Sequence, residues 1–167
     1  LAGRNREDIE SIGERLGLET RVFSLEDPEE VHRGISGMKL VLHCAGPFSR
    51  TSAPMVDACL KEGAHYLDIT GEIGVFSAAH ERDDEARRLD VVLLPGAGFD
   101  VVPTDCLAAI LVEALPAATS LQLAFEAAGG PSPGTAKTSV EGMASGGRVR
   151  RDGKLVEVPL GWKTRKI

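Results

Sequence analysis

The alternation of short apolar runs with helical segments constrains the fold of this chain most strongly. Met38–Ala45 is a near-continuous apolar run of strand length, which is typical of a parallel strand covered on both faces. Further strands are predicted at Thr20–Leu25, His65–Ile69 and Val91–Leu94. Helices are predicted after Asn5, with apolar positions Ile9, Ile12 and Leu16, and at Pro28–Gly34, Ser52–Glu62 and Ile73–Leu89. This order predicts an α/β fold with a doubly wound parallel sheet, whose ligands bind beyond the carboxyl ends of the strands.

Capping signals mark the first two helices. Asn5 is placed to cap the first helix, and Gly17 to close it. Asp27 precedes a first-turn proline in the second, and Glu30 stands where it can complete a capping box with Asp27.

The pattern changes at about residue 117. A longer strand is predicted at Ser120–Ala127, followed by a Gly/Pro-rich break at 129–134 and a helix at Thr135–Ala144. Asp152-Gly153 suits a type I′ turn, whose register sets Val149 against Val156 and Arg148 against Glu157. We therefore expect a dinucleotide-binding domain over 1–117 and the start of an α+β catalytic or substrate domain over 118–167.

Composition excludes several classes of function. The chain has 167 residues, 43% of them hydrophobic, and a net charge of −6, which gives no footprint for nucleic acid. No run approaches the roughly 18 apolar residues of an integral membrane segment, and the first residues lack a signal-peptide layout, so we expect a cytoplasmic location. The three cysteines include no C-x-x-C pair and are interpreted as reduced thiols.

Two strand ends carry candidate cofactor contacts. Leu1-Ala2-Gly3 is interpreted as the end of a strand, and the next residues are Arg4 and Asn5. An arginine at this place in a dinucleotide fold accommodates the 2′-phosphate of NADP, whereas an acidic residue selects NAD; an exposed arginine can also be only a solvated charge. Ala45, Gly46, Pro47 and Phe48 follow the most apolar strand, and either let a ligand approach the backbone or simply form a turn.

The next two strand ends bring more polar groups together. Asp68, Gly71 and Glu72 follow one predicted strand, although helix capping by Thr70 or Glu72 above a buried Tyr66 explains the same residues. Gly98 and Asp100 follow the other. We reject Gly96-Ala97-Gly98 as the primary phosphate loop because Val101 stands in place of the third glycine.

Metal and nucleophile chemistry have little support. His43 is predicted to be a hydrogen-bonded core residue, His32 and His80 to lie on polar helix faces, and His65 to border a strand end. No pair of histidines has metal-ligand spacing, so no metal is expected. Cys106 near a helix start has no partnered base, and the basic hairpin residues are interpreted as a solvated edge.

These segments together resemble a known family. Ala-Gly-Pro-Phe-Ser at residue 45, Gly-Ala-His-Tyr-Leu-Asp at 63, Thr-Gly-Glu at 70 and Gly-Phe-Asp-Val-Val-Pro-Thr-Asp at 98 are similar in combination to the saccharopine dehydrogenase-like oxidoreductases. The branch is that of trans-acting enoyl reductases. The resemblance runs from Arg4 to Gly161-Trp162-Lys163-Thr164-Arg165 and so covers nearly the whole chain. Gly98-Phe99-Asp100 departs from the Gly-Leu-Asp-Pro-Gly of saccharopine reductases, which argues against saccharopine as substrate.

The resemblance implies an N-terminal Rossmann domain that binds NADP in preference to NAD, with Arg4 near the 2′-phosphate and the Ala45–Phe48 loop beside the nicotinamide half. It also implies a C-terminal catalytic domain and, before Leu1, a first strand and glycine loop of about 25 to 30 residues. We therefore expect the chain to be truncated at both ends.

A hydride-transferring oxidoreductase acting on an enoyl or imine substrate is the leading functional hypothesis. The cofactor carries that chemistry, and the catalytic acid stays unknown. The alternative is a non-catalytic dinucleotide-binding or protein-interaction domain. We expect the 167 residues alone to be inactive. In the strand order 3-2-1-4-5-6 the first strand is central, so its place must be filled by another segment, by a neighbouring chain in a homo-oligomer, or by rearrangement.

Overall fold

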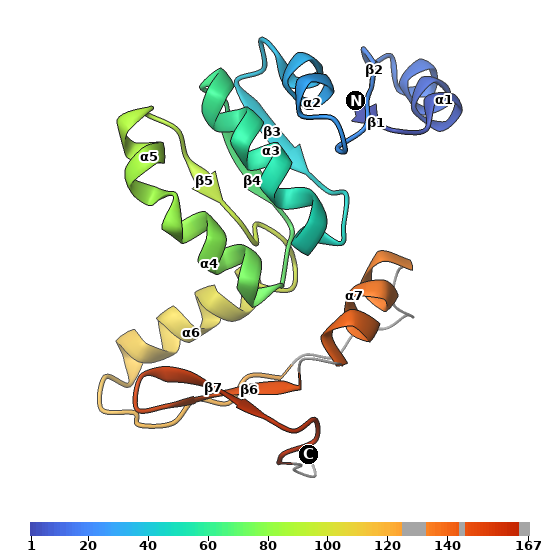
Figure 1. The fold of residues 1–167 in the computed structure, drawn as a ribbon. Helices are drawn as coiled ribbons and strands as arrows, with labels where there is room; N and C mark the ends of the chain where they lie inside the picture. Colours follow the sequence, from blue (N-terminus) through green and yellow to red (C-terminus); the bar gives the residue numbers. More distant parts are fainter. Residues whose placement is uncertain (125–132, 144–145, 164–167) are drawn as a thin grey trace. The chain divides into compact units, whose positions relative to one another are not determined.

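The computed structural model describes residues 1–124, 133–143 and 146–163 (Figure 1). The chain divides into two compact units, Leu1–Ala124 and Phe125–Ile167. The domain boundary near residue 117 stays a prediction. No helix among the described residues is both long and apolar enough to cross a membrane.

Strands and helices alternate through the first unit, as predicted. Its strands are β1 (Ala2–Gly3), β2 (Arg21–Val22), β3 (Leu40–His43), β4 (His65–Asp68) and β5 (Leu93–Leu94). Its helices are α1 (Arg6–Leu16), α2 (Pro28–Ile35), α3 (Phe48–Glu62), α4 (Ile73–Glu81), α5 (Asp83–Arg88) and α6 (Val102–Ala114).

The strands of this unit pair in parallel, as the predicted fold class requires. β1 pairs with β2, and β3, β4 and β5 form a second sheet in that order, with His43 opposite Asp68. Among the described residues these two sheets are separate. That a first strand belongs between β1 and β3, as the order 3-2-1-4-5-6 implies, stays a prediction.

The core lies between the β3–β4–β5 sheet and helices α2 and α3. Val31 of α2, Cys59 of α3 and Tyr66 of β4 are completely buried there. Val41 of β3 packs against this core, but Leu40 and Leu42 are 50% and 58% exposed. The expectation that this strand is covered on both faces is therefore wrong for the described residues, because α2 and α3 pack on the face that carries Val41.

Two predictions about helices are corrected. α3 begins at Phe48, four residues before the predicted start, and the helix predicted over Ile73–Leu89 is broken at Arg82. The backbone of Arg82 has φ −94° and ψ 6°, and its guanidinium donates to Asp57 of α3 at 2.5 Å and to Glu85 of α5 at 2.6 Å. The Arg82 side chain therefore links the junction of α4 and α5 to α3 through hydrogen bonds.

The predicted caps of the first two helices hold only in part. Gly17 closes α1 in the left-handed conformation, but Asn5 donates its amide to Asp8 and leaves the helix backbone uncapped. Asp27 accepts from the backbone N–H groups of Glu29 and Glu30, as an N-cap should. The capping box is wrong, because the Glu30 carboxylate accepts from the N–H of Ser24 at 3.2 Å instead.

The end of the first unit differs from the prediction. None of the described residues of the apolar helix α6 is buried. Residues 120–124 are not a strand, and the rest of the strand predicted over Ser120–Ala127 lies outside the described residues. The same holds for residues 129–132 of the Gly/Pro-rich break.

The second unit contains α7 (Pro133–Met143) and a hairpin of β6 (Gly147–Arg151) and β7 (Lys154–Val158). Val149 pairs with Val156 and Arg148 with Glu157, which confirms the predicted register. The turn residues Asp152 and Gly153 have φ of 50° and 77°, as a type I′ turn requires.

Candidate functional site at the strand ends

The loop between β3 and α3 exposes part of its backbone. Ala45 and Gly46 are exposed, and the Gly46–Pro47 peptide bond is cis. A methyl group on Gly46 would lie 3.5 Å from the Phe48 ring, an ordinary contact, and the φ of Gly46 is not in the left-handed region. Neither packing nor backbone conformation therefore requires glycine here, although the residue is exposed.

Two other residues hold this loop in place. The Thr51 hydroxyl donates to the carbonyls of Ala45 at 2.6 Å and Pro47 at 3.1 Å. The Glu72 carboxylate accepts from the N–H groups of Phe48 at 2.9 Å and Ser49 at 2.8 Å. The sequence placed Glu72 near the site but gave no sign of these partners, and it missed Thr51 altogether.

Asp68 at the end of β4 is completely buried and joins two loops. Its Oδ1 accepts from the N–H of Thr70 at 2.9 Å and of Gly96 at 2.8 Å, and its Oδ2 accepts the Tyr66 hydroxyl at 2.7 Å. Its carbonyl accepts from Ala97 at 2.7 Å. Burial, followed by this hydrogen bond to Asp68, raises the pKa of Tyr66. Asp68 therefore organises the loops after β4 and β5 from beneath and does not face a ligand.

Thr70 continues this network toward α3. It is buried, and its hydroxyl accepts the N–H of Glu72 at 3.0 Å. The carbonyl of Glu72 accepts from Val75 at 3.0 Å in the first turn of α4. Tyr66 is buried, as the capping interpretation expects, but neither Thr70 nor Glu72 caps α4 with its side chain. The carboxylate of Glu72 caps α3 instead.

The remaining predicted residues lie around the same edge of the sheet. A methyl group on Gly71 would be 3.9 Å from the exposed side chain of Asp100, so the loops after β4 and β5 meet there. Gly98 has a packing explanation, since a methyl group on it would be 2.9 Å from Cβ of Ile69. Phe99, beside it, is 67% exposed.

His43 lies beneath the Ala45–Phe48 loop and is only 5% exposed. Its ring meets the Phe48 ring edge-on, with centroids 5.5 Å apart, and it neighbours Tyr66. The prediction of a core histidine is correct, but within the part of the chain that the structure describes its Nε2 has no hydrogen-bond partner. Burial lowers the pKa of His43, and the nearby Asp68 opposes that shift.

Arg4 and Asn5 stand at the end of the other sheet. Arg4 is exposed directly after β1, and the structure shows no ion pair or hydrogen bond of its guanidinium with any described residue. The side-chain amide of Asn5 donates a hydrogen bond to the Asp8 carboxylate at 2.5 Å. Arg4 is therefore available to a phosphate group, and Asn5 is so only if it releases Asp8.

The other histidines and the cysteines have structural surroundings. His65 Nδ1 accepts the N–H of Val92 at 3.1 Å, and His32 contacts Glu62 at 3.0 Å. Cys106 is exposed, while burial raises the pKa of the Cys59 thiol to about 12. Among the described residues, no group of three or more His, Cys, Asp or Glu could hold a metal ion.

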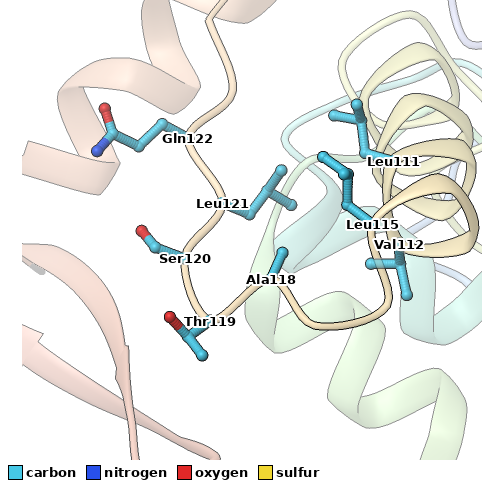
Figure 2. A pocket seen from close by; sticks show the side chains of 8 residues that line it. All are labelled: Leu111, Val112, Leu115, Ala118, Thr119, Ser120, Leu121 and Gln122. Atoms are coloured by element: carbon cyan, nitrogen blue, oxygen red, sulfur yellow. The ribbon is translucent and has the colours of Figure 1, made fainter.

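An apolar groove of about 360 Å³ lies at the far end of α6 from these loops. Figure 2 shows its lining, in which Leu111 of α6 and Leu115, just after that helix, lie across from Leu121. It contains none of the predicted site residues and no charged side chain. It is therefore not part of the candidate site.

The parallel strand order and the open, small-residue loop at a strand end define a dinucleotide-binding α/β domain. Residues 1–93 match the family described as the saccharopine dehydrogenase NADP-binding domain, which covers more than half of the chain. The chain belongs to this family, as the resemblance predicted, and NADP is the cofactor that the family's description specifies.

Known relatives agree with this assignment. Over 117 residues, the chain is 28% identical to a saccharopine dehydrogenase-like oxidoreductase of Mus musculus, matching 63% of this chain and 27% of the relative. A trans-acting enoyl reductase of Mycobacterium leprae is 29% identical over 113 residues, with the same two shares covered. The chain thus spans about a quarter of the length of these relatives.

A solved structure has the same fold. Apo saccharopine dehydrogenase of Saccharomyces cerevisiae superposes with a TM-score of 0.60 at 10% identity, covering 69% of this chain and 25% of that one.

We expect Asp68→Ala to lower the free energy of unfolding by about 3 kcal/mol or more, because it strands three buried donors that each cost about 1 to 3 kcal/mol. Asp68→Asn should cost less, since one amide oxygen can still accept from Thr70 and Gly96 while its NH₂ donates to Tyr66. Urea denaturation measures both. Equal losses for the two variants would contradict the proposed network.

The stability of the chain should fall as the pH drops below about 6.5, the ordinary pKa of histidine. The pKa of His43 is lowered in the folded state, so the unfolded state takes up this proton first. Its contribution is therefore fully present above the unfolded pKa and is lost below it. Melting at pH 7.5 and 5.5 should show a smaller fall for His43→Gln than for the native chain, and an unchanged fall for the control His80→Gln on the exposed side of α4.

Proposed function

We propose that the protein is an NADPH-dependent oxidoreductase in which the loops after β1 and β3 contact the cofactor. The observation that carries the proposal is the Ala45–Phe48 loop. Its backbone is exposed at Gly46, where protein packing does not require glycine, while Thr51 and Glu72 hold the loop from behind. A fixed loop without side-chain bulk is what a flat ring and its ribose need for close approach.

The residues of the chain fit a dinucleotide at both sheets. Arg4 would meet the 2′-phosphate with an uncommitted guanidinium, and Asn5 would lie beside it. Ala45, Gly46, Pro47 and Phe48 would line the nicotinamide half, and Gly71 and Asp100 would border the substrate. NADPH, when bound, supplies the hydride. These residues bind and orient, and no catalytic acid is assigned.

An enoyl or imine compound is the substrate class that we propose. Support comes from the relatives named trans-acting enoyl reductase and saccharopine dehydrogenase-like oxidoreductase. We also propose a cytoplasmic location, although one relative, from Arabidopsis thaliana, is named as probably mitochondrial. A homo-oligomer in which a strand of a second copy lies between β1 and β3 remains a proposal as well.

NADPH oxidation by the protein at its full natural length tests this function. We expect NADPH binding by fluorescence titration, and a fall in absorbance at the reduced nicotinamide band when an enoyl or imine substrate is added. Tight binding of NADPH without oxidation across both substrate classes would contradict the enzyme and favour a non-catalytic dinucleotide-binding domain.

The role of Arg4 predicts a change in cofactor preference. Arg4→Ala should weaken NADPH binding about 10- to 100-fold, because a hydrogen bond to a charged group contributes about 1.5 to 3 kcal/mol. NADH binding should stay unchanged, since NADH lacks the 2′-phosphate. Arg6→Ala is the matched control, because Arg6 lies in α1 and pairs with Glu10 at 2.8 Å. An equal loss of both cofactors in Arg4→Ala would contradict the assignment.

A further inference from the structure

The amino end of α3 is capped by a residue from a distant part of the chain. Pro47 stands at the N-cap position and has no side chain that can accept a hydrogen bond. The two oxygens of Glu72, 24 residues later, accept from the N–H groups of Phe48 and Ser49. These are charge-assisted bonds in the geometry that a bound phosphate would use at a helix amino end.

Glu72 is held firmly in this position. Its own N–H donates to Thr70, its carbonyl caps the first turn of α4, and Asp68 fixes Thr70 in turn. The carboxylate is therefore presented to α3 by a backbone that is bonded on both sides. An anion could reach the amino end of α3 only by displacing a charged side chain that the fold holds in place.

This arrangement bears on how a dinucleotide can lie. The amino end of a helix after a parallel strand attracts phosphate, and NADPH carries a diphosphate bridge and a 2′-phosphate that could bind there in the wrong orientation. Glu72 places a negative charge at that point and occupies both donors. A phosphate is repelled, whereas an uncharged ring and ribose are not.

We propose that Glu72 is a positioning and specificity residue: it closes the amino end of α3 to phosphate, so that the Ala45–Phe48 loop receives the uncharged nicotinamide–ribose part of the cofactor. The inference rests on the proposed function for the identity of the ligand. The closure of α3 to anions stands on the hydrogen bonds alone.

The variant Glu72→Gln tests the proposal in the protein at its full natural length. Glutamine has nearly the same shape, but its NH₂ cannot accept from a backbone N–H, so one donor of α3 is released and the charge is lost. We expect inorganic pyrophosphate, titrated by calorimetry, to bind Glu72→Gln at least 10-fold more tightly than the native protein. NADPH should bind at least as tightly, because a competing orientation adds to the native one, but its oxidation at saturating NADPH should slow, because part of the bound cofactor lies in the wrong orientation. Glu81→Gln, at the exposed end of α4, is the matched control and should match the native protein in both titrations.

A merely structural role for Glu72 would give a different result. It would lower the melting temperature without creating affinity for pyrophosphate, and Glu72→Asp serves as a second variant that keeps the charge and should keep pyrophosphate out. Native pyrophosphate affinity in a folded Glu72→Gln protein would overturn the proposal. If the native protein binds no NADPH, the proposed function fails, and the pyrophosphate titration still decides whether Glu72 closes α3.

Discussion

The buried carboxylate of Asp68 is the constraint on which the candidate site depends. A charge without access to water has to be matched by donors, and Asp68 collects them from Tyr66 beside it, from Thr70 in its own loop and from Gly96 after the next strand. The loops after β4 and β5 therefore cannot move independently. The Thr70 hydroxyl accepts the N–H of Glu72, and the Glu72 carboxylate accepts the N–H of Phe48, so the same network also fixes the amino end of α3.

Two acidic residues thus play opposite parts at one sheet edge. Asp68 is buried, and its carboxylate oxygens accept hydrogen bonds from protein groups, so the residue stabilises the fold. Glu72 lies at the surface end of the same network and turns its charge toward the amino end of a helix. The result is an open loop at Ala45–Phe48 whose backbone positions are set from behind, which is the pre-organisation that binding of a flat cofactor ring needs.

The sequence could predict the elements because their signals are local. Periodicity located the parallel strands, and Asp152-Gly153 fixed the register of the hairpin to the residue. Asp68 and Glu72 were recognised as residues at strand ends, yet their partners lie 28 and 24 residues away and depend on how the loops meet. The exposed face of β3 could not be predicted either, because a continuous apolar run does not indicate which face of the strand another element covers.

Hydrogen exchange at the backbone of the full-length protein, with and without NADPH, tests the central claim most directly. The claim is that the pre-organised loop after β3 and the residues after β1 form the cofactor surface. It predicts slower exchange on NADPH addition in peptides covering residues 3–6 and 44–49, with little change around the groove of Leu111 and Leu121. Protection by NADPH that leaves residues 44–49 unchanged would contradict it.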